Sequence, residues 1–392
     1  MFKVKNNLSL VLVIILSLKI FFSFKNEIFA ENKAKFAILA DYNTGAIIYE
    51  KNADEKMFPS SMTKIMTTYL LFSALDSKQI TLDQKLQVST KASSINGSKM
   101  FIKEGSYVRV DDIIRGIIVQ SGNDACIALS ENLSGTESAF VEKMNLTAEQ
   151  LGMKNTKFVN SSGWPNPEQV TTARDLAILS KALIHDFPQY YHYHSEKEFK
   201  YNNILQQNRN SLLSIKSVDG IKTGRTELGG YGVAFSAKKD GYRIIGVING
   251  LNSAKERHES AAELISFSFN QFTHKFIYKS GDIIGETNVI YGNKRKINAI
   301  ITSDITVFIP KIFSKNENNS LNQNNPLIEL YLKQNIKAPI KIGDNLGYIL
   351  FKQRMLAGNE IKIPVVANEN INKGSFIEHL AQNISFLVAK FI

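Results

Sequence analysis

Three short motifs in a fixed order constrain this chain more than any other feature of its sequence. They are Ser61-Met-Thr-Lys64, Ser121-Gly-Asn123 and Lys222-Thr-Gly224. About 60 residues separate the first from the second, and about 100 separate the second from the third. Each motif alone occurs by chance in a long chain. In this order they describe one active site, in which a lysine rather than a histidine activates a nucleophilic serine.

The first motif predicts a serine and a lysine on one face of a helix. Pro59 precedes an apolar pattern over residues 65–71 that has the spacing of a buried helix face. Ser61 then falls in the first turn, and Lys64 follows one turn later on the same side. Lysine acts as a base only when it is neutral. Its pKa must therefore fall well below about 10.4, through burial and a nearby cation.

The second and third motifs supply the other polar groups of the predicted site. Lys222 is the expected cation that lowers the pKa of Lys64. Ser121 can pass a proton between Lys64 and the leaving amine. Asn123 can orient Lys64 and hold a substrate amide.

A strand that carries Lys222, Thr223 and Gly224 can pair with an extended substrate, and its Lys and Thr side chains would meet a carboxylate. The backbone N–H groups of Ser61 and Arg225 would stabilise the oxyanion, an effect of about 3–4 kcal/mol per donor.

Hydrophobic periodicity predicts an α+β fold for the motif-bearing part. A hairpin is expected over 36–49, and adjacent antiparallel strands over 218–223, 231–237 and 242–248. Helices are expected over 110–135 with a break at 120–123, over 171–183 and over 261–276.

From about residue 279 the sequence changes to short alternating runs with turns, and it carries no catalytic cluster. Strands are expected at 306–309, 328–332, 348–351 and 361–366, with 314–325 as an exposed loop. These strands predict a small β-sandwich or barrel.

Both ends of the chain carry signals for the cell envelope. Lys3 and Lys5 precede the apolar run 8–18, which is too short to span a bilayer. This is an export signal with a cleavage point at Ala30, or alternatively an uncleaved anchor. At the other end, residues 375–392 form an amphipathic helix that could lie in a membrane interface. The alternative is that this helix packs on the protein's own body.

The predicted organisation therefore has four segments. They are a signal peptide (1–30), a catalytic domain (31–277), a small β-rich domain (278–370) and a membrane-associating helix (371–392). The net charge of +11 suits an anionic envelope or membrane surface, or reflects a lysine-rich background. Since no basic stripe is interleaved with aromatic residues, we expect no nucleic-acid partner.

In its motifs and their order the chain resembles the D-alanyl-D-alanine carboxypeptidases of the low-molecular-mass penicillin-binding protein family, over roughly residues 33–277. The similarity extends through the following segments: Ser121-Gly-Asn-Asp-Ala-Cys126, Thr172-Ala-Arg-Asp175, Asn208-Arg209-Asn210 and Val218-Asp-Gly-Ile-Lys-Thr-Gly224. The resemblance implies a five-stranded antiparallel sheet flanked by helices. It also implies release of the terminal D-alanine from peptidoglycan pentapeptide, covalent capture by β-lactams, and no metal or cofactor.

The resemblance has further implications for single residues and for location. It places Arg209 near the substrate carboxylate. Arg225 stands where relatives often carry histidine, which bears on substrate preference and on the lifetime of the acyl-enzyme. Arg174 and Asp175 are expected to form a structural salt-bridge pair. The protein is expected on the periplasmic side of the inner membrane, peripherally attached.

Three other functions are open to a chain of this sequence. A serine β-lactamase needs a water-activating carboxylate, and Glu168 lies in the right interval. A non-catalytic peptidoglycan-binding protein would keep the pocket without turnover. A metal enzyme would use His192 and His194, but the sequence shows no third ligand.

Overall fold

The computed structural model describes all residues except 1–31, 312–327, 353–354, 357–359 and 389–392. The predicted signal peptide and the predicted loop 314–325 therefore lie outside the described residues.

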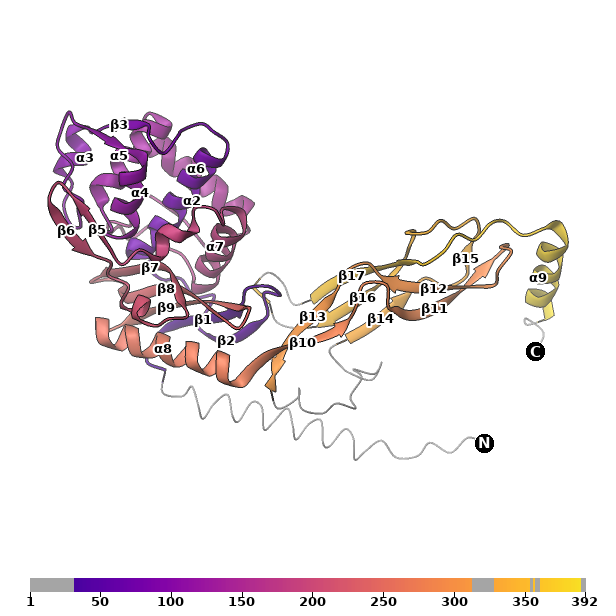
Figure 1. Ribbon diagram of the computed structural model, residues 1–392. Helices are drawn as coiled ribbons and strands as arrows, with labels where there is room; N and C mark the ends of the chain where they lie inside the picture. Colours follow the sequence, from indigo (N-terminus) through magenta and orange to yellow (C-terminus); the bar gives the residue numbers. More distant parts are fainter. Residues whose placement is uncertain (1–31, 312–327, 353–354, 357–359, 389–392) are drawn as a thin grey trace.

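The N-terminal unit is built on a five-stranded antiparallel sheet with the order β2-β1-β9-β8-β7 (Figure 1). Its strands are β1 (Phe36–Asp41), β2 (Ile47–Lys51), β7 (Val218–Thr226), β8 (Gly230–Lys239) and β9 (Tyr242–Leu251). The predicted hairpin and the three predicted strands of the third motif region are confirmed.

Helices cover both faces of this sheet because both faces are apolar. Along β1, Ile38 faces one hydrophobic core, whereas Ala37 and Leu39 face the other, as the two-residue period of a strand requires. The second face is covered by α8 (Ala254–Gln271), and the first by a group of helices that carries the motifs. That group comprises α2 (Lys64–Asp76), α3 (Thr90–Ser94), α4 (Val110–Ile118), α5 (Asn123–Ser134), α6 (Glu137–Gln150) and α7 (Ala173–Asp186).

Short elements complete the unit. The 3₁₀ turns are η1 (Ser60–Thr63), η2 (Tyr191–Ser195) and η3 (Ser211–Ser214). Two hairpins lie outside the main sheet, β3–β4 (Lys85–Gln87 and Tyr107–Arg109) and β5–β6 (Glu198–Tyr201 and Ile204–Gln207).

The helix predicted over 261–276 differs from α8 at both ends. Ser253 starts α8 early, because its side chain accepts a hydrogen bond from the backbone N–H of Glu256 at 3.1 Å. The helix ends at Gln271, and the next residues form β10 (Phe272–Tyr278), which pairs with β13 (Ile305–Pro310). A partner strand distant in sequence thus overrides the local helical pattern.

The C-terminal unit is rich in β-structure and has its own hydrophobic core. Its six-stranded sheet has the order β14-β16-β17-β12-β11-β15. These strands are β11 (Ile283–Ile290), β12 (Lys296–Ile301), β14 (Ile328–Leu332), β15 (Ile336–Lys337), β16 (Asn345–Lys352) and β17 (Glu360–Ala367). The four strands predicted after residue 279 are present as β13, β14, β16 and β17. Strands β11, β12 and β15 were not predicted. Helix α9 (Phe376–Val388) lies at the end of this unit, far from the first sheet (Figure 1).

The two units meet at the turn after β1. The Leu356 N–H donates to the Gly45 carbonyl at 2.9 Å, and the His274 ring lies 3.0 Å from Asp41. Arg174 donates to the Met355 carbonyl at 3.2 Å.

The predicted salt bridge between Arg174 and Asp175 is wrong, because each residue binds other partners. Arg174 pairs with Glu50 at 2.9 Å and with Asp54 at 2.5 Å. Asp175 instead accepts a hydrogen bond from the Thr156 hydroxyl at 2.7 Å. Neighbouring side chains on a helix point in different directions, so these two residues reach different parts of the fold.

Asp124 fixes the loop that faces the second motif. Its fully buried carboxylate accepts hydrogen bonds from the backbone N–H groups of Met100 (3.0 Å), Phe101 (2.9 Å) and Ile102 (3.3 Å). This arrangement anchors residues 100–102 to the start of α5.

The substitution Asp124→Asn should destabilise the N-terminal unit. It replaces an accepting oxygen by an NH₂ group that faces buried N–H donors, so we expect the free energy of unfolding to fall by about 3 kcal/mol. Urea denaturation measures this change. The control Asp83→Asn, at an exposed ion pair, should change it by less than about 0.5 kcal/mol. Equal effects of the two substitutions would contradict the anchoring role.

Candidate active site

Lys64 is the centre of the candidate site. It is fully buried, and its Nζ lies 3.2 Å from Ser61 Oγ, 2.8 Å from Asn123 Oδ1 and 2.5 Å from the Ser162 carbonyl oxygen. A neutral amine has two N–H groups and one lone pair. When the N–H groups donate to Asn123 and Ser162, the lone pair can accept the proton of the Ser61 hydroxyl.

Burial is the largest cause of the low pKa of Lys64. This pKa lies at about 8, since burial and the charge of Arg209 lower it and the charge of Asp124 opposes the shift. The Cys126 thiol is uncharged at neutral pH, because burial raises its pKa to about 12.

Two cations lie near the Lys64 amine, Arg209 and Lys222. Arg209 lowers the pKa of Lys64 in addition to burial. The predicted cation, Lys222, also interacts with the Lys64 amine, and the repulsion between the two ammonium groups disfavours the state in which both are charged. The pKa of Lys222 lies well below its ordinary value, first because of burial and then because of Lys64 and Arg209.

Ser61 lies in η1, directly before α2, and not within the α-helix itself. Two neighbouring segments approach the backbone of this turn so closely that each has a glycine at the point of contact. A Cβ atom on Gly163, whose φ is +80°, would lie 1.8 Å from the Ser60 carbonyl oxygen. A Cβ atom on Gly224 would lie 2.9 Å from the carbonyl oxygen of Pro59. The third motif therefore lies against the backbone next to Ser61.

Ser121 lies in the break between α4 and α5, in a left-handed backbone conformation with φ of +59°. Its side chain is buried, and its Oγ has no hydrogen-bond partner among the residues that the structure describes. A buried hydroxyl without a partner is rare in a folded protein and calls for an explanation.

Asn123 begins α5, and its amide orientation is set by its neighbours. Its backbone N–H donates to the Ser98 carbonyl oxygen at 2.7 Å, and its Nδ2 donates to the Asn96 carbonyl oxygen at 2.9 Å. The amide oxygen is thereby left to accept from Lys64.

Lys222, Thr223 and Gly224 lie on β7, at the edge of the sheet next to η1. An edge strand of this kind can pair with an extended peptide. The Arg225 side chain is exposed and lies over the ring of Tyr231, 5.0 Å from its centroid.

Arg209 is linked to the second motif through Ser98, because its Nη1 donates to Ser98 Oγ at 2.6 Å and the Ser98 carbonyl accepts from the Asn123 N–H. The structure thus gathers the residues of all three motifs around η1. The catalytic and binding roles of the nine predicted residues stay predictions.

The loop 160–169 contributes contacts that the sequence analysis missed. The Ser162 group that meets Lys64 is a backbone carbonyl, which no side-chain motif reveals. Asn160 shapes this loop, since its Oδ1 accepts from the N–H groups of Gly163 (2.8 Å) and Trp164 (3.0 Å).

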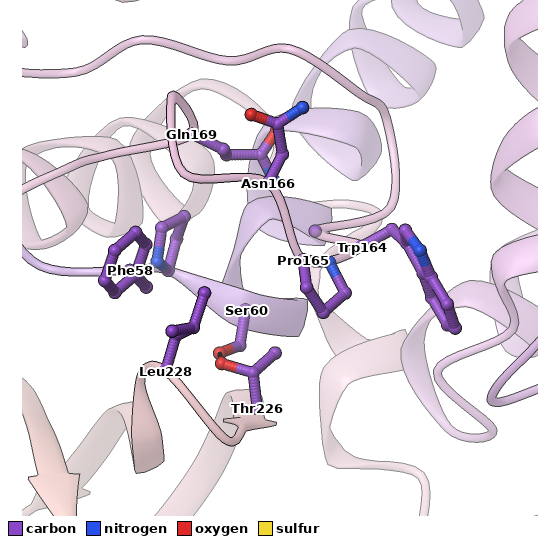
Figure 2. Close-up of a pocket in the computed structure, with 10 residues that line it drawn as sticks. Phe58, Ser60, Trp164, Pro165, Asn166, Gln169, Thr226 and Leu228 are labelled. Carbon is purple, nitrogen blue, oxygen red and sulfur yellow. Dashed lines mark hydrogen bonds between the residues drawn. The ribbon is translucent and has the colours of Figure 1, made fainter.

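The same loop borders a small hollow on the side of Ser60 rather than Ser61. Figure 2 shows Trp164 and Pro165 on one side of it, with Leu228 beside Ser60. The Ser60 and Thr226 hydroxyls are 2.9 Å apart at its base.

The residues of two alternative functions are not arranged for those functions. The Glu168 side chain is 67% exposed and pairs with Lys157 at 2.5 Å. This position does not support a role for Glu168 as the water-activating base of a β-lactamase. His194 is buried, its Nδ1 lies 3.2 Å from the Ile221 carbonyl oxygen, and burial lowers its pKa to about 4. Across the described part of the chain, no group of three His, Cys, Asp or Glu side chains could hold a metal.

Comparisons with known proteins agree with this geometry. The model of the D-alanyl-D-alanine carboxypeptidase family (peptidase S11) matches residues 24–253, and that of the C-terminal domain of penicillin-binding protein 5 matches residues 272–373. The D-alanyl-D-alanine carboxypeptidase DacC of Escherichia coli is 38% identical over 88% of this chain and 85% of its own length.

Solved structures show the same architecture. Penicillin-binding protein 5 of Haemophilus influenzae is 33% identical, with a TM-score of 0.75 over 88% of this chain and 98% of its own. Penicillin-binding protein D2 of Listeria monocytogenes, in its cefotaxime-bound form, is 30% identical, with a TM-score of 0.56 over 60% of this chain and 97% of its own. The chain therefore belongs to the peptidase S11 family of D-alanyl-D-alanine carboxypeptidases.

Proposed function

We propose that this serine peptidase removes the terminal D-alanine from peptidoglycan pentapeptides, through an acyl-enzyme on Ser61. The observation that carries the proposal is the buried Lys64 amine, 3.2 Å from Ser61 Oγ. Its two other hydrogen-bond partners are acceptors, so its lone pair is directed at the serine hydroxyl.

In the acylation step, Lys64 takes the Ser61 proton while Oγ attacks the carbonyl of the penultimate D-alanine. The backbone N–H groups of Ser61 and Arg225 would bind the developing oxyanion. Ser121 would carry the proton from Lys64 to the amine of the departing D-alanine. Water then hydrolyses the ester and frees Ser61.

The substrate would bind as an additional strand beside β7, through the backbone near Thr223. Its terminal carboxylate would meet the positive charges of Lys222 and Arg209. A β-lactam would acylate Ser61 in the same way, because its strained amide occupies the place of the D-Ala-D-Ala bond.

The proposed place of action is the cell wall, outside the cytoplasm, with roles in wall maturation and cell shape. The organisation proposed for the chain is a signal peptide (1–30), a catalytic domain (31–277), a β-rich domain (278–370) and a helix (371–392). Among the described residues, no helix is long and apolar enough to cross a bilayer. Attachment through α9 at a membrane surface is part of the proposal, supported by the exposed Phe376 (80%) and Ile377 (77%).

The substitution Ser61→Ala should abolish both covalent penicillin capture and D-alanine release, because it removes the attacking oxygen. Intact-protein mass spectrometry after penicillin treatment measures the first, and D-alanine release from a pentapeptide ending in D-Ala-D-Ala measures the second. The matched control is Ser60→Ala, which should keep the adduct, since Ser60 Oγ faces Thr226. A penicillin adduct on the Ser61→Ala protein would refute the assignment. Rapid penicillin turnover by the wild type would favour a β-lactamase.

The rate of acylation should rise with pH through about 8, the pKa of Lys64. Lysine loses its proton as pH rises, so about a tenth of the protein is active at pH 7 and about half at pH 8. Arg209→Gln removes a positive charge that lowers this pKa, so the midpoint should move to higher pH. Acylation by a fluorescent penicillin between pH 6 and 10 tests both statements. A flat profile would exclude Lys64 as the base.

Removal of residues 375–392 should release the exported protein from membranes. A finer variant replaces Phe376 and Ile377 by serine, which removes two exposed apolar side chains and should weaken binding to anionic vesicles at least about tenfold. Vesicle co-sedimentation measures the change, and Asn383→Ser on the same helix is the control. If all variants bind as the wild type does, α9 is not the attachment site.

A further inference from the structure

We propose that Glu137 is a positioning residue for the base Lys64, and that it acts through the backbone of Ser161 and Ser162. This inference rests on the proposed role of Lys64 in acylation. None of the three motifs includes Glu137, and its carboxylate does not touch Ser61.

Glu137 opens α6, directly after the N-cap residue Thr136, and its side chain is only 14% exposed. One carboxylate oxygen accepts two hydrogen bonds from Ser161, from the backbone N–H at 3.1 Å and from the hydroxyl at 2.8 Å. The other oxygen accepts from Lys91 Nζ at 2.7 Å. A single carboxylate therefore fixes both the backbone and the side chain of Ser161, which is fully buried.

The carboxylate is charged under the conditions of the reaction. Burial raises the pKa of Glu137, but hydrogen bonds from Lys91 and Ser161 outweigh burial and hold the pKa below its ordinary value. Charged acceptors form stronger hydrogen bonds than neutral ones. Glu137 is thus a firm anchor for a loop whose other side chains are mostly uncharged.

The anchored segment contacts α2 at two points one helical turn apart. The Ser161 carbonyl accepts from Thr67 Oγ1 at 2.5 Å, and the Ser162 carbonyl accepts from Lys64 Nζ at 2.5 Å. Lys64 and Thr67 are three residues apart, so they lie on one face of the helix. Fixing Ser161 therefore also fixes where the Ser162 carbonyl meets the amine.

The direction of the Lys64 lone pair depends on this carbonyl. Rotation about the last bond of a lysine side chain moves all three positions on its nitrogen together. If this carbonyl moved away, the nitrogen could turn, and the lone pair would point at Ser61 for a smaller fraction of the time. Acylation needs this alignment, whereas non-covalent binding of the substrate does not.

The test compares three variants of the full chain by stopped-flow acylation with a fluorescent penicillin, which separates the binding constant from the acylation rate constant. Glu137→Ala removes the anchor. We expect the rate constant to fall about 10- to 100-fold, with the binding constant changed less than about 3-fold. Glu137→Gln keeps an oxygen that can accept from Ser161 and should restore the rate to within about 5-fold of the wild type. Lys91→Ala removes only the ion pair and should stay within about 3-fold.

These outcomes distinguish positioning from a purely structural role. An unchanged acylation rate in the Glu137→Ala protein, folded at the assay temperature, would overturn the inference. So would an equal loss in the Lys91→Ala protein, which would assign the effect to the ion pair. Failure of the proposed function would instead be seen in the wild type, as the absence of a penicillin adduct on Ser61.

Discussion

The structure of the site depends on the burial of one amine. Moving the Lys64 ammonium out of water is unfavourable, and the protein lowers its pKa instead of fully compensating the charge. No carboxylate accepts a hydrogen bond from Nζ in the described residues; its partners are a hydroxyl, an amide oxygen and a backbone carbonyl. A carboxylate in any of these places would stabilise the ammonium form and raise the pKa. Burial thus lowers the pKa of Lys64, and the neutrality of its hydrogen-bond partners leaves that shift largely in place.

Close backbone packing brings these partners together. The loop 160–169 and strand β7 both lie against η1, and glycines 163 and 224 permit the approach. Two serines of the site have unusual backbone conformations, since φ is +50° at Ser60 and +59° at Ser121. Non-glycine residues in the left-handed region cost free energy, and such residues gather at functional sites. The surrounding helices and the buried Asp124 hold the site in this arrangement.

The parts of the site that could be predicted are those that side-chain chemistry defines. The pairing of Ser61 with Lys64 could be predicted from their spacing of one helical turn. The adjacent strands around Lys222 could be predicted from the periodicity of their hydrophobic residues. The Ser162 carbonyl could not be predicted, because every residue has one and only the fold decides which one meets Lys64. The same limit hid the end of α8, where pairing of Phe272 with β13 decided the structure. It also hid the partners of Arg174, which lie more than one hundred residues away along the chain.

The position of Glu168 has a consequence for the whole reaction. Hydrolysis of an acyl-enzyme needs a group that takes a proton from water. Glu168, the acidic residue that a β-lactamase would use for this purpose, is exposed and paired with Lys157. In the proposed mechanism the Lys64 amine, 3.2 Å from the oxygen that would carry the acyl group, would serve both half-reactions. It must lose the serine proton before it can take one from water, which is the task that Ser121, with its unpartnered hydroxyl, can perform. An acyl group that displaces either contact would leave the ester without a base. In the proposed mechanism, the arrangement that would activate Ser61 therefore also leaves the site open to lasting capture by a substrate analogue.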